Sequence, residues 1–241
     1  MLEYLYNNDF SQIVYYIFHV FGFIGVFVFN YFNSSNYSIK KAHSCVITAC
    51  VYSIMYIWIY ILFWIESGFS EFGGNNIVRG FVYIPLIAYP FGRLFKINLL
   101  TLCDFIAPCI CLCQAISHVG CIFTGCCRGF ENDWGIYNPA LKIITFPSQL
   151  IESIIALIIF IVVIRYAKFK AYDLSGKSFA LMLVLFGSTR FICEFARVNN
   201  KIIIGCSSLA FHALFMAIVG AIMMISLNYK KNIKVVRKRR K

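Results

Sequence analysis

Long apolar stretches separated by short polar segments run along almost the whole chain. A helix needs about 20 apolar residues to cross the roughly 30 Å hydrocarbon core of a bilayer. The sequence offers seven such stretches, at about 10–32, 43–65, 80–98, 100–126, 148–166, 178–197 and 207–228. This pattern predicts an all-α, polytopic integral membrane protein with seven transmembrane helices. No repeat or separate soluble segment interrupts it, so residues 1–241 are predicted to form a single membrane domain.

The basic residues between these stretches predict the orientation, because cytoplasmic loops are enriched in Lys and Arg. Most of the 22 basic residues lie in the segments 33–42, 93–96, 165–177 and 229–241. The acids that lie on the other side are Glu3, Asp9, Glu66, Glu71, Glu131 and Asp133. We therefore expect the N-terminus outside and the C-terminus in the cytoplasm. No basic segment precedes the first stretch, which predicts a retained helix and not a cleaved signal peptide.

Composition excludes two classes of protein. The chain is 61% hydrophobic and 13% charged, whereas soluble domains carry about 25% charged residues, so an ordinary soluble enzyme is excluded. The net charge is +12, but eight basic residues and no acid fall between Lys230 and Lys241. A basic run directly after an apolar stretch is typical of a cytoplasmic anchor that faces anionic lipid. We expect a membrane as partner and no nucleic acid.

A few ionisable residues remain inside or at the edges of the stretches. They are Arg79, Asp104, His118, Glu152, Arg190, Glu194 and Arg197. A charge inside a membrane costs at least about 2.5–3.5 kcal/mol, so function is the default hypothesis for such residues. Asp104, near the inner face, is instead interpreted as a packing residue. With about 1.5 Å of rise per residue, the others are predicted to share one outer-leaflet layer, near the loop that carries residues 126–129.

The charges of this layer favour an anionic ligand. Arg190, Glu194 and Arg197 are spaced i, i+4 and i+7, so they share one helix face. That face presents guanidinium groups to a phosphate, with Glu194 holding them in place, or else forms an ion-paired packing seam. Together with Arg79 and His118, the arginines indicate an anionic phospholipid.

Ten of the 11 cysteines fall into two groups. Seven lie in apolar runs and are interpreted as small hydrophobic residues: Cys45, Cys50, Cys103, Cys109, Cys111, Cys113 and Cys193. His118 and Cys121 are i, i+3 neighbours, an arrangement that can make a thiolate reactive, and Cys126 and Cys127 form an adjacent pair beside the outer loop. Their spacing is not that of a zinc site, so no metal and no cofactor are predicted. His19, His43 and His212 are interpreted as isolated structural residues.

Four segments in order resemble the prolipoprotein diacylglyceryl transferases. They are Asp-Phe-Ile-Ala-Pro at 104–108, the segment 117–129, Phe-Pro-Ser-Gln-Leu-Ile-Glu at 146–152 and Arg-Phe-Ile-Cys-Glu-Phe-Ala-Arg at 190–197. The resemblance covers about residues 10–227 and is strongest from 79 to 199. It implies a seven-span protein of the bacterial cytoplasmic (inner) membrane. Its partners would be phosphatidylglycerol, or another anionic phospholipid, and the signal peptide of a preprolipoprotein, whose cysteine thiol receives the diacylglyceryl group. The enzyme itself then needs no thiol.

The sequence departs from the family pattern at several signature positions. His118 stands for the family's Arg, Cys121 for its Asn and Cys126 for its Glu. Arg79 stands for a His, so the Arg and His have in effect exchanged places. Phe146 replaces a second His, and Phe21-Gly22 corresponds to the family's Tyr-Gly. The joint appearance of Cys at 121, 126 and 127 indicates a divergent branch.

These observations assign roles to twelve residues. The predicted catalytic residues are His118, Arg190, Glu152 and Cys126. The predicted substrate-binding residues are Arg79, Cys121, Gly125, Cys127, Ser148, Gln149, Glu194 and Arg197. One alternative is a Cys/His-dependent membrane lipid transferase, or a thiol-redox enzyme, with a different acceptor. The other is a non-catalytic lipid-binding or assembly protein, or a small transporter.

Overall fold

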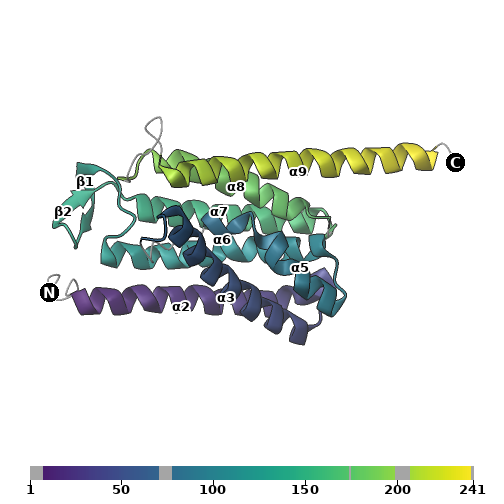
Figure 1. The fold of residues 1–241 in the computed structure, drawn as a ribbon, viewed down its shortest axis with the longest axis horizontal. Helices are drawn as coiled ribbons and strands as arrows, with labels where there is room; N and C mark the ends of the chain where they lie inside the picture. Colours follow the sequence, from purple (N-terminus) through teal and green to yellow (C-terminus); the bar gives the residue numbers. More distant parts are fainter. Residues whose placement is uncertain (1–7, 71–77, 174, 199–206, 240–241) are drawn as a thin grey trace.

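A bundle of helices with one small hairpin makes up the described chain (Figure 1). The computed structural model describes residues 8–70, 78–173, 175–198 and 207–239. Its helices are α2 (Asn8–Asn33), η1 (Ser34–Tyr37), α3 (Lys41–Glu66), α4 (Val78–Phe81), α5 (Ile84–Phe95), α6 (Leu99–Thr124), α7 (Ser148–Phe169), α8 (Lys177–Glu194) and α9 (Ser208–Arg239). Glu3, Glu71 and the last two residues of the basic tail, which the sequence assigned to one side or the other, lie outside the described residues.

The predicted membrane character is confirmed. Five helices in the described residues are long and apolar enough to cross a bilayer: Phe10–Tyr37, Lys41–Glu66, Leu99–Thr124, Ser148–Phe169 and Ser208–Tyr229. The basic tail continues α9 to Arg239. The chain is therefore a multi-pass membrane protein.

Two of the seven predicted spans, 80–98 and 178–197, are not among these five helices. The stretch 80–98 forms two helices, α4 and the 12-residue α5. Pro85, in the first turn of α5, has no backbone N–H to donate, which favours a helix start there instead of a continuous helix from α4. Helix α8 lies where it was predicted, but Lys177, Arg190 and Glu194 place three charges in its 18 residues. The count of seven spans stays a prediction.

Helix α6 occupies the centre of the bundle. In the most apolar 18-residue segment of α6, 72% of the residues are buried, against 11% in the corresponding segment that begins in α2. Figure 1 shows α2 and α9 on opposite sides of the bundle, with the start of α2 and the end of α9 at opposite ends of its long axis. Asn98 begins α6 as its N-cap, because its side chain accepts a hydrogen bond from the Leu100 N–H at 2.8 Å. Residues near either end of α6 are thereby placed deep inside the protein.

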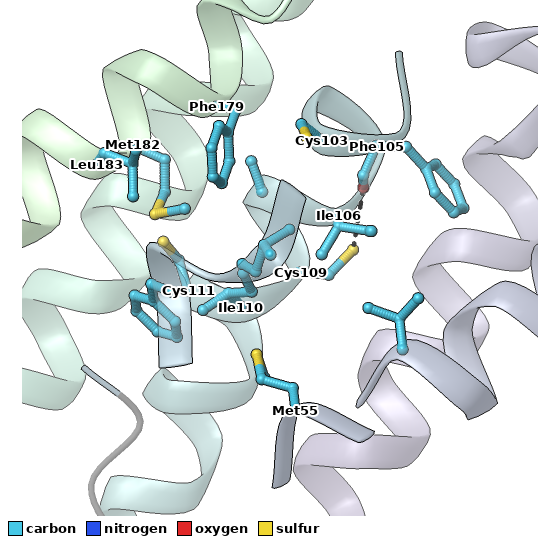
Figure 2. Packing of buried hydrophobic residues seen from close by; sticks show 14 of the residues in the cluster. Met55, Cys103, Phe105, Ile106, Cys109, Ile110, Cys111, Phe179, Met182 and Leu183 are labelled. Carbon is cyan, nitrogen blue, oxygen red and sulfur yellow. Dashed lines mark hydrogen bonds between the residues drawn. The ribbon is translucent and has the colours of Figure 1, made fainter. Parts of the chain in front are cut away.

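Cysteines fill the core around α6 as the sequence predicted. Cys103, Cys109 and Cys111 are fully buried among Ile, Leu, Phe and Met side chains (Figure 2). The Cys109 Sγ lies 3.8 Å from the Phe105 carbonyl oxygen one turn earlier. Their burial agrees with the interpretation as small hydrophobic residues for Cys103 and Cys111, whereas the Cys109 thiol also donates a hydrogen bond to Asn30 Oδ1 at 2.7 Å.

Asp104 joins α6 to the start of α8. Its two carboxylate oxygens accept hydrogen bonds from the backbone N–H groups of Gly176, at 2.8 Å, and Phe179, at 2.9 Å. The carboxylate thus satisfies two of the donors that a helix N-terminus leaves unpaired. The interpretation of Asp104 as a packing residue is confirmed.

The loop between α6 and α7 corrects the all-α prediction in one detail. It contains an antiparallel hairpin of β1 (Glu131–Asn138) and β2 (Ile143–Thr145), in which Tyr137 pairs with Ile144. The hairpin lies at the same end of the bundle as the N-terminus (Figure 1). The Asn138 side-chain amide donates a hydrogen bond to the Gly125 carbonyl at 2.8 Å, which ties the hairpin to the end of α6.

Two glycines bring α8 and α9 into close contact. A Cβ atom added at Gly187 would lie 2.6 Å from the Ala217 backbone nitrogen, and one added at Gly220 would lie 2.8 Å from that of Val184. Small residues that allow backbones to approach are typical of helix packing in membranes. This contact fixes the start of α9 beside the C-terminal half of α8.

Candidate functional site

Glu152 stands at the centre of a buried group of charges. Its Oε1 lies 3.2 Å from Arg190 Nη1 and 2.8 Å from Arg197 Nε, and its Oε2 lies 3.5 Å from His118 Nδ1. The four side chains come from the C-terminal half of α6, the first turns of α7 and the end of α8. Each is at most 11% exposed. The structure therefore brings together four residues of the predicted layer that are far apart in the sequence.

Glu194 extends this group toward α9. Its Oε2 lies 2.8 Å from Arg190 Nη2, and its Oε1 accepts a hydrogen bond from the Ser207 hydroxyl at 2.6 Å. Ser207 also begins α9, because its Oγ accepts a hydrogen bond from the Ala210 N–H. The predicted role of Glu194 in holding Arg190 agrees with this geometry. Ser207 was missed, since a serine beside an apolar stretch gives no signal of its own.

Arg197 reaches the group from beyond the last residue of α8. It forms an isolated antiparallel bridge with Gly129, and the Phe130 N–H donates to the Ala196 carbonyl at 3.2 Å. The loop between α6 and α7 therefore positions this guanidinium, although the sequence predicted it on a continuous helix face. The guanidinium also lies beside the Cys127 side chain. Arg197 thus links Glu152 to the turn that follows α6.

A tight turn after α6 forms the edge of the site. Gly125 ends the helix with φ +69°, and Cys127 also adopts the left-handed region, with φ +58°. The Gln149 amide donates to the Cys126 carbonyl and the Ser148 hydroxyl to the Cys127 carbonyl, both at 2.7 Å. Ser148 and Gln149 therefore hold the turn from the start of α7. Their role in binding substrate stays a prediction.

Three ligand-type atoms gather where this turn meets α6. One atom each of His118, Cys121 and Cys127 lie within 4.8 Å of one another. All three residues are at least partly buried, and both cysteines are free thiols. The Cys126 side chain is exposed, and its Sγ accepts a hydrogen bond from Thr124 Oγ1 at 3.2 Å. The sequence predicted neighbouring His118 and Cys121, but not that Cys127 would turn back toward both.

The electrostatics of the turn favour a thiolate at one position. Hydrogen bonds from the thiols of Cys121 and Cys126 hold the pKa of the Cys127 thiol well below its ordinary value, and the Arg197 guanidinium acts in the same direction. Positive surroundings of this kind are typical of reactive cysteines.

Arg79 belongs to a neighbouring group of polar residues. Its Nε lies 2.9 Å from Glu66 Oε2, and its guanidinium lies over the Phe63 ring. His212 Nε2 lies 3.1 Å from the other oxygen of Glu66, and the Ser208 hydroxyl donates to Glu66 Oε2 at 3.2 Å. The interpretation of His212 as isolated is therefore wrong. Ser207 and Ser208, adjacent at the start of α9, contact the two groups separately.

The remaining histidines have structural contacts. His19 Nδ1 lies 2.9 Å from the Tyr15 carbonyl oxygen, and His43 stacks on Phe95.

The contacts of Glu66 are not among the sequence predictions, which place it only with the acids on the outer side. Its position at the end of one apolar stretch, opposite an Arg at the start of the next, was a usable signal for an ion pair.

The fold and the site define the class of protein: a helical membrane protein with buried arginine–glutamate pairs near one end of the bundle. The family model described as prolipoprotein diacylglyceryl transferase matches residues 7–226. The chain belongs to this family, and the resemblance seen in the sequence is confirmed.

Individual relatives are distant. The chain is 25% identical over 171 residues to phosphatidylglycerol–prolipoprotein diacylglyceryl transferase 2 of Clostridium perfringens, covering 68% of the chain and 66% of the relative. It is 33% identical over 126 residues to the phosphatidylglycerol–prolipoprotein diacylglyceryl transferase of Campylobacter curvus, covering 51% and 44%. With the enzyme of that name from Clostridioides difficile it shares 27% over 189 residues, covering 77% and 74%. The chain thus spans about half to three quarters of the length of these relatives.

Proposed function

We propose that this protein transfers the diacylglyceryl group of phosphatidylglycerol, or a related anionic phospholipid, to the cysteine thiol of a preprolipoprotein signal peptide. Membership of the family and the names of its relatives support the reaction. The observation in the fold that carries the proposal is the pair of buried guanidinium groups, of Arg190 and Arg197, that meet at Glu152 Oε1. A phosphate is the anion whose oxygens such guanidinium groups bind best.

In this proposal the two arginines act on the donor lipid. They bind its phosphate and stabilise the charge that grows on it as the carbon–oxygen bond to the diacylglyceryl group breaks, which is the kind of electrostatic assistance that lowers a barrier most. Glu152 keeps both guanidinium groups in place through Oε1, and Glu194 braces Arg190 from the other side. The leaving group is glycerol phosphate.

The acceptor thiol is placed at the other end of the same group. His118 faces Glu152 there, and the sulfur atoms of Cys121 and Cys127 lie beside its ring. The thiol must lose its proton before its sulfur attacks the glycerol carbon, since the thiolate is the nucleophile. Arg79 and its Glu66 partner are proposed to contact the outer part of the donor lipid.

The proposed setting is the bacterial cytoplasmic membrane, with seven spans, the N-terminus outside and the C-terminus in the cytoplasm. The basic segments of the sequence support this orientation. It places the hairpin and the charged group at the outer leaflet. Labelling of intact cells with a membrane-impermeant reagent, at single cysteines introduced at Asp133 and Lys170, tests it: modification is expected at 133 and not at 170.

Transfer in proteoliposomes tests the reaction itself. Purified protein is incubated with phosphatidylglycerol and a peptide that carries a lipobox cysteine, and mass spectrometry looks for the diacylglyceryl thioether. Arg190→Ala is expected to abolish the product, whereas Arg93→Ala, at an exposed arginine of α5, is expected to leave the rate within about twofold. Folded protein that forms no product with any anionic donor would contradict the proposal and favour a non-catalytic lipid-binding role.

The gathered thiols favour a second candidate, a transferase that carries the lipid on its own cysteine. Cys121 and Cys127 lie close together, and the environment of Cys127 promotes the thiolate. Intact-protein mass spectrometry of enzyme quenched during turnover separates the two candidates. A diacylglyceryl adduct on the protein would support the second, and an unmodified protein with product on the peptide would support the first.

A further inference from the structure

The sulfur atoms of Cys121 and Cys127 lie close to the His118 ring, an arrangement that can bind a metal ion. We propose that His118, Cys121 and Cys127 bind a Zn²⁺ ion, and that the acceptor thiol becomes its fourth ligand as a thiolate. This inference rests on the proposed transferase function. It names the means by which the same site activates its acceptor, and it differs from the absence of a metal that the linear spacing predicted.

The donor set fits zinc in type and in distance. Thiolate sulfur and imidazole nitrogen are its usual ligands, at about 2.3 Å and about 2.0–2.1 Å. Two sulfurs on a tetrahedral zinc ion are therefore about 3.8 Å apart. The ligand atoms of the three residues already lie within 4.8 Å of one another. The proposal requires these side chains to move closer to one ion than the 4.8 Å spacing that they show.

The backbone presents the three ligands from one rigid corner. His118 and Cys121 occupy positions i and i+3 of α6, and so share a face of that helix. Cys127 faces them because its backbone is left-handed, a conformation that costs a non-glycine residue about 1–3 kcal/mol. The Ser148 hydroxyl holds this peptide through the Cys127 carbonyl. Strain of this kind, maintained by a neighbouring helix, is typical of functional sites.

The surroundings complete such a centre. His118 Nδ1 lies 3.5 Å from Glu152 Oε2, so the proposal assigns Nε2 to the metal and Nδ1 to the carboxylate. Histidines that bind metals generally have a carboxylate partner of this kind on the second nitrogen. Two thiolates and the incoming third one leave a zinc centre with net charge −1. The Arg197 guanidinium beside Cys127 supplies the compensating positive charge.

Three protein ligands leave one position for a substrate. Structural zinc sites have four protein ligands, whereas catalytic sites have three and an open position. Among the residues that the structure describes, the group within 4.8 Å contains three donors. Cys126 is exposed and accepts a hydrogen bond from the Thr124 hydroxyl, and it is outside the group of three. The fourth position is assigned to the acceptor thiol.

The reaction at this centre balances in atoms and charge. The acceptor thiol gives its proton to water at the outer face when it binds Zn²⁺, because a coordinated thiol is deprotonated. Its sulfur then attacks the glycerol carbon that carries the phosphate. One carbon–sulfur bond forms as one carbon–oxygen bond breaks, and the electron pair leaves with glycerol phosphate, held by Arg190 and Arg197. The product is a neutral thioether, a poor zinc ligand, and nothing is oxidised or reduced.

Metal binding is measured first, without reference to activity. Full-length protein is loaded with Zn²⁺ in detergent, passed through a desalting column and analysed for metal. One zinc per chain is expected in the wild type, with loss of at least about 80% in Cys121→Ser and Cys127→Ser. Cys113→Ser, on the same helix but outside the cluster, is expected to keep the ion. Replacement by Co²⁺ should give a thiolate charge-transfer band that the two cluster variants lack. Equal zinc in Cys121→Ser and the wild type would overturn the site.

Transfer is measured second, on the same preparations. Removal of the metal by a chelator is expected to lower the rate at least tenfold, and added Zn²⁺ is expected to restore it. Full turnover by metal-free protein would overturn the inference while leaving the transferase function intact, since His118 would then act as a base alone. One bound zinc per chain without transfer by any form would overturn the transferase function and thiol activation, but not the metal site.

Discussion

Two buried carboxylates, Asp104 and Glu152, lie at opposite ends of the protein interior and are bonded in opposite ways. Both oxygens of Asp104 accept backbone N–H groups from the start of α8. Glu152 contacts only charged or ionisable side chains among the partners described, namely Arg190, Arg197 and His118. Asp104 is held by the backbone, whereas two buried guanidinium groups share one oxygen of Glu152.

This difference separates a structural charge from a functional one. Backbone amides are fixed in place, so the N–H groups that Asp104 accepts hold it to the start of α8 and add no charge that could bind an anionic ligand. Guanidinium groups each have five donors, so two of them around one carboxylate leave donors for a phosphate. A charged residue inside a membrane is assumed to be functional by default. The groups that pair with it decide whether that hypothesis is kept.

The largest effect is expected from Glu152→Gln. The substitution removes the counter-charge that Arg190 and Arg197 share and leaves Glu194 as the ion-pair partner of Arg190; breaking a buried ion pair costs about 3–5 kcal/mol. Transfer from phosphatidylglycerol is expected to fall at least about 100-fold. The rate is measured per folded protein, with size-exclusion chromatography as the check on folding. A folded variant with more than a third of the wild-type rate would contradict a functional role for Glu152.

Asp104→Asn is expected to act on stability and not on turnover. The amide can accept at one oxygen only, so one N–H group of α8 loses its partner, at a cost of about 1–3 kcal/mol. The midpoint of thermal unfolding in detergent should fall, while transfer per folded molecule stays within about twofold. A loss of transfer as large as that of Glu152→Gln would show that the two carboxylates do not differ in kind.

Arg79→Gln is expected to have an intermediate effect on substrate binding. Its partner Glu66 keeps contacts with His212 and Ser208, so the neighbouring group remains connected. The KM for the donor lipid should rise about 3–10-fold with kcat little changed, as expected when an interaction is made equally in the ground and transition states. Glu66→Gln serves as the matched variant. If kcat falls and KM does not change, Arg79 acts in the reaction step itself.

The smallest effect is expected from Cys111→Ala. Cys111 lies in α6 between Asp104 and His118, the residue that faces Glu152. The side chain is fully buried in the core, and its truncation removes one sulfur without exposing a polar group. A stability loss of about 1 kcal/mol is expected from the small cavity, with unchanged transfer and unchanged metal content. Lost transfer would show that this thiol, interpreted as hydrophobic filler, belongs to the site.

The sequence predicted the helices and much of the charged group, for a physical reason. Apolar length is a one-dimensional property, and so is the depth of a residue along a helix, which placed His118, Glu152 and Arg190 in one layer. The break before α5 depends on local proline geometry that a hydropathy pattern smooths over. The left-handed turn at Cys127 and the bridge from Gly129 to Arg197 are three-dimensional contacts without a periodic signal. For that reason the metal-type cluster was not predictable from spacing.

The turn after α6 is held by its backbone and not by its side chains. Gln149 and Ser148 bond to the carbonyl oxygens of Cys126 and Cys127, which every amino acid possesses. These bonds to the turn therefore do not depend on the side chains at 126 and 127, although Gly125 is required by its left-handed backbone. Evolution can exchange the chemistry at positions 126 and 127 while the Pro-Ser-Gln segment keeps the frame unchanged. The same independence makes this turn a place where new acceptor specificities can be introduced without redesign of the bundle.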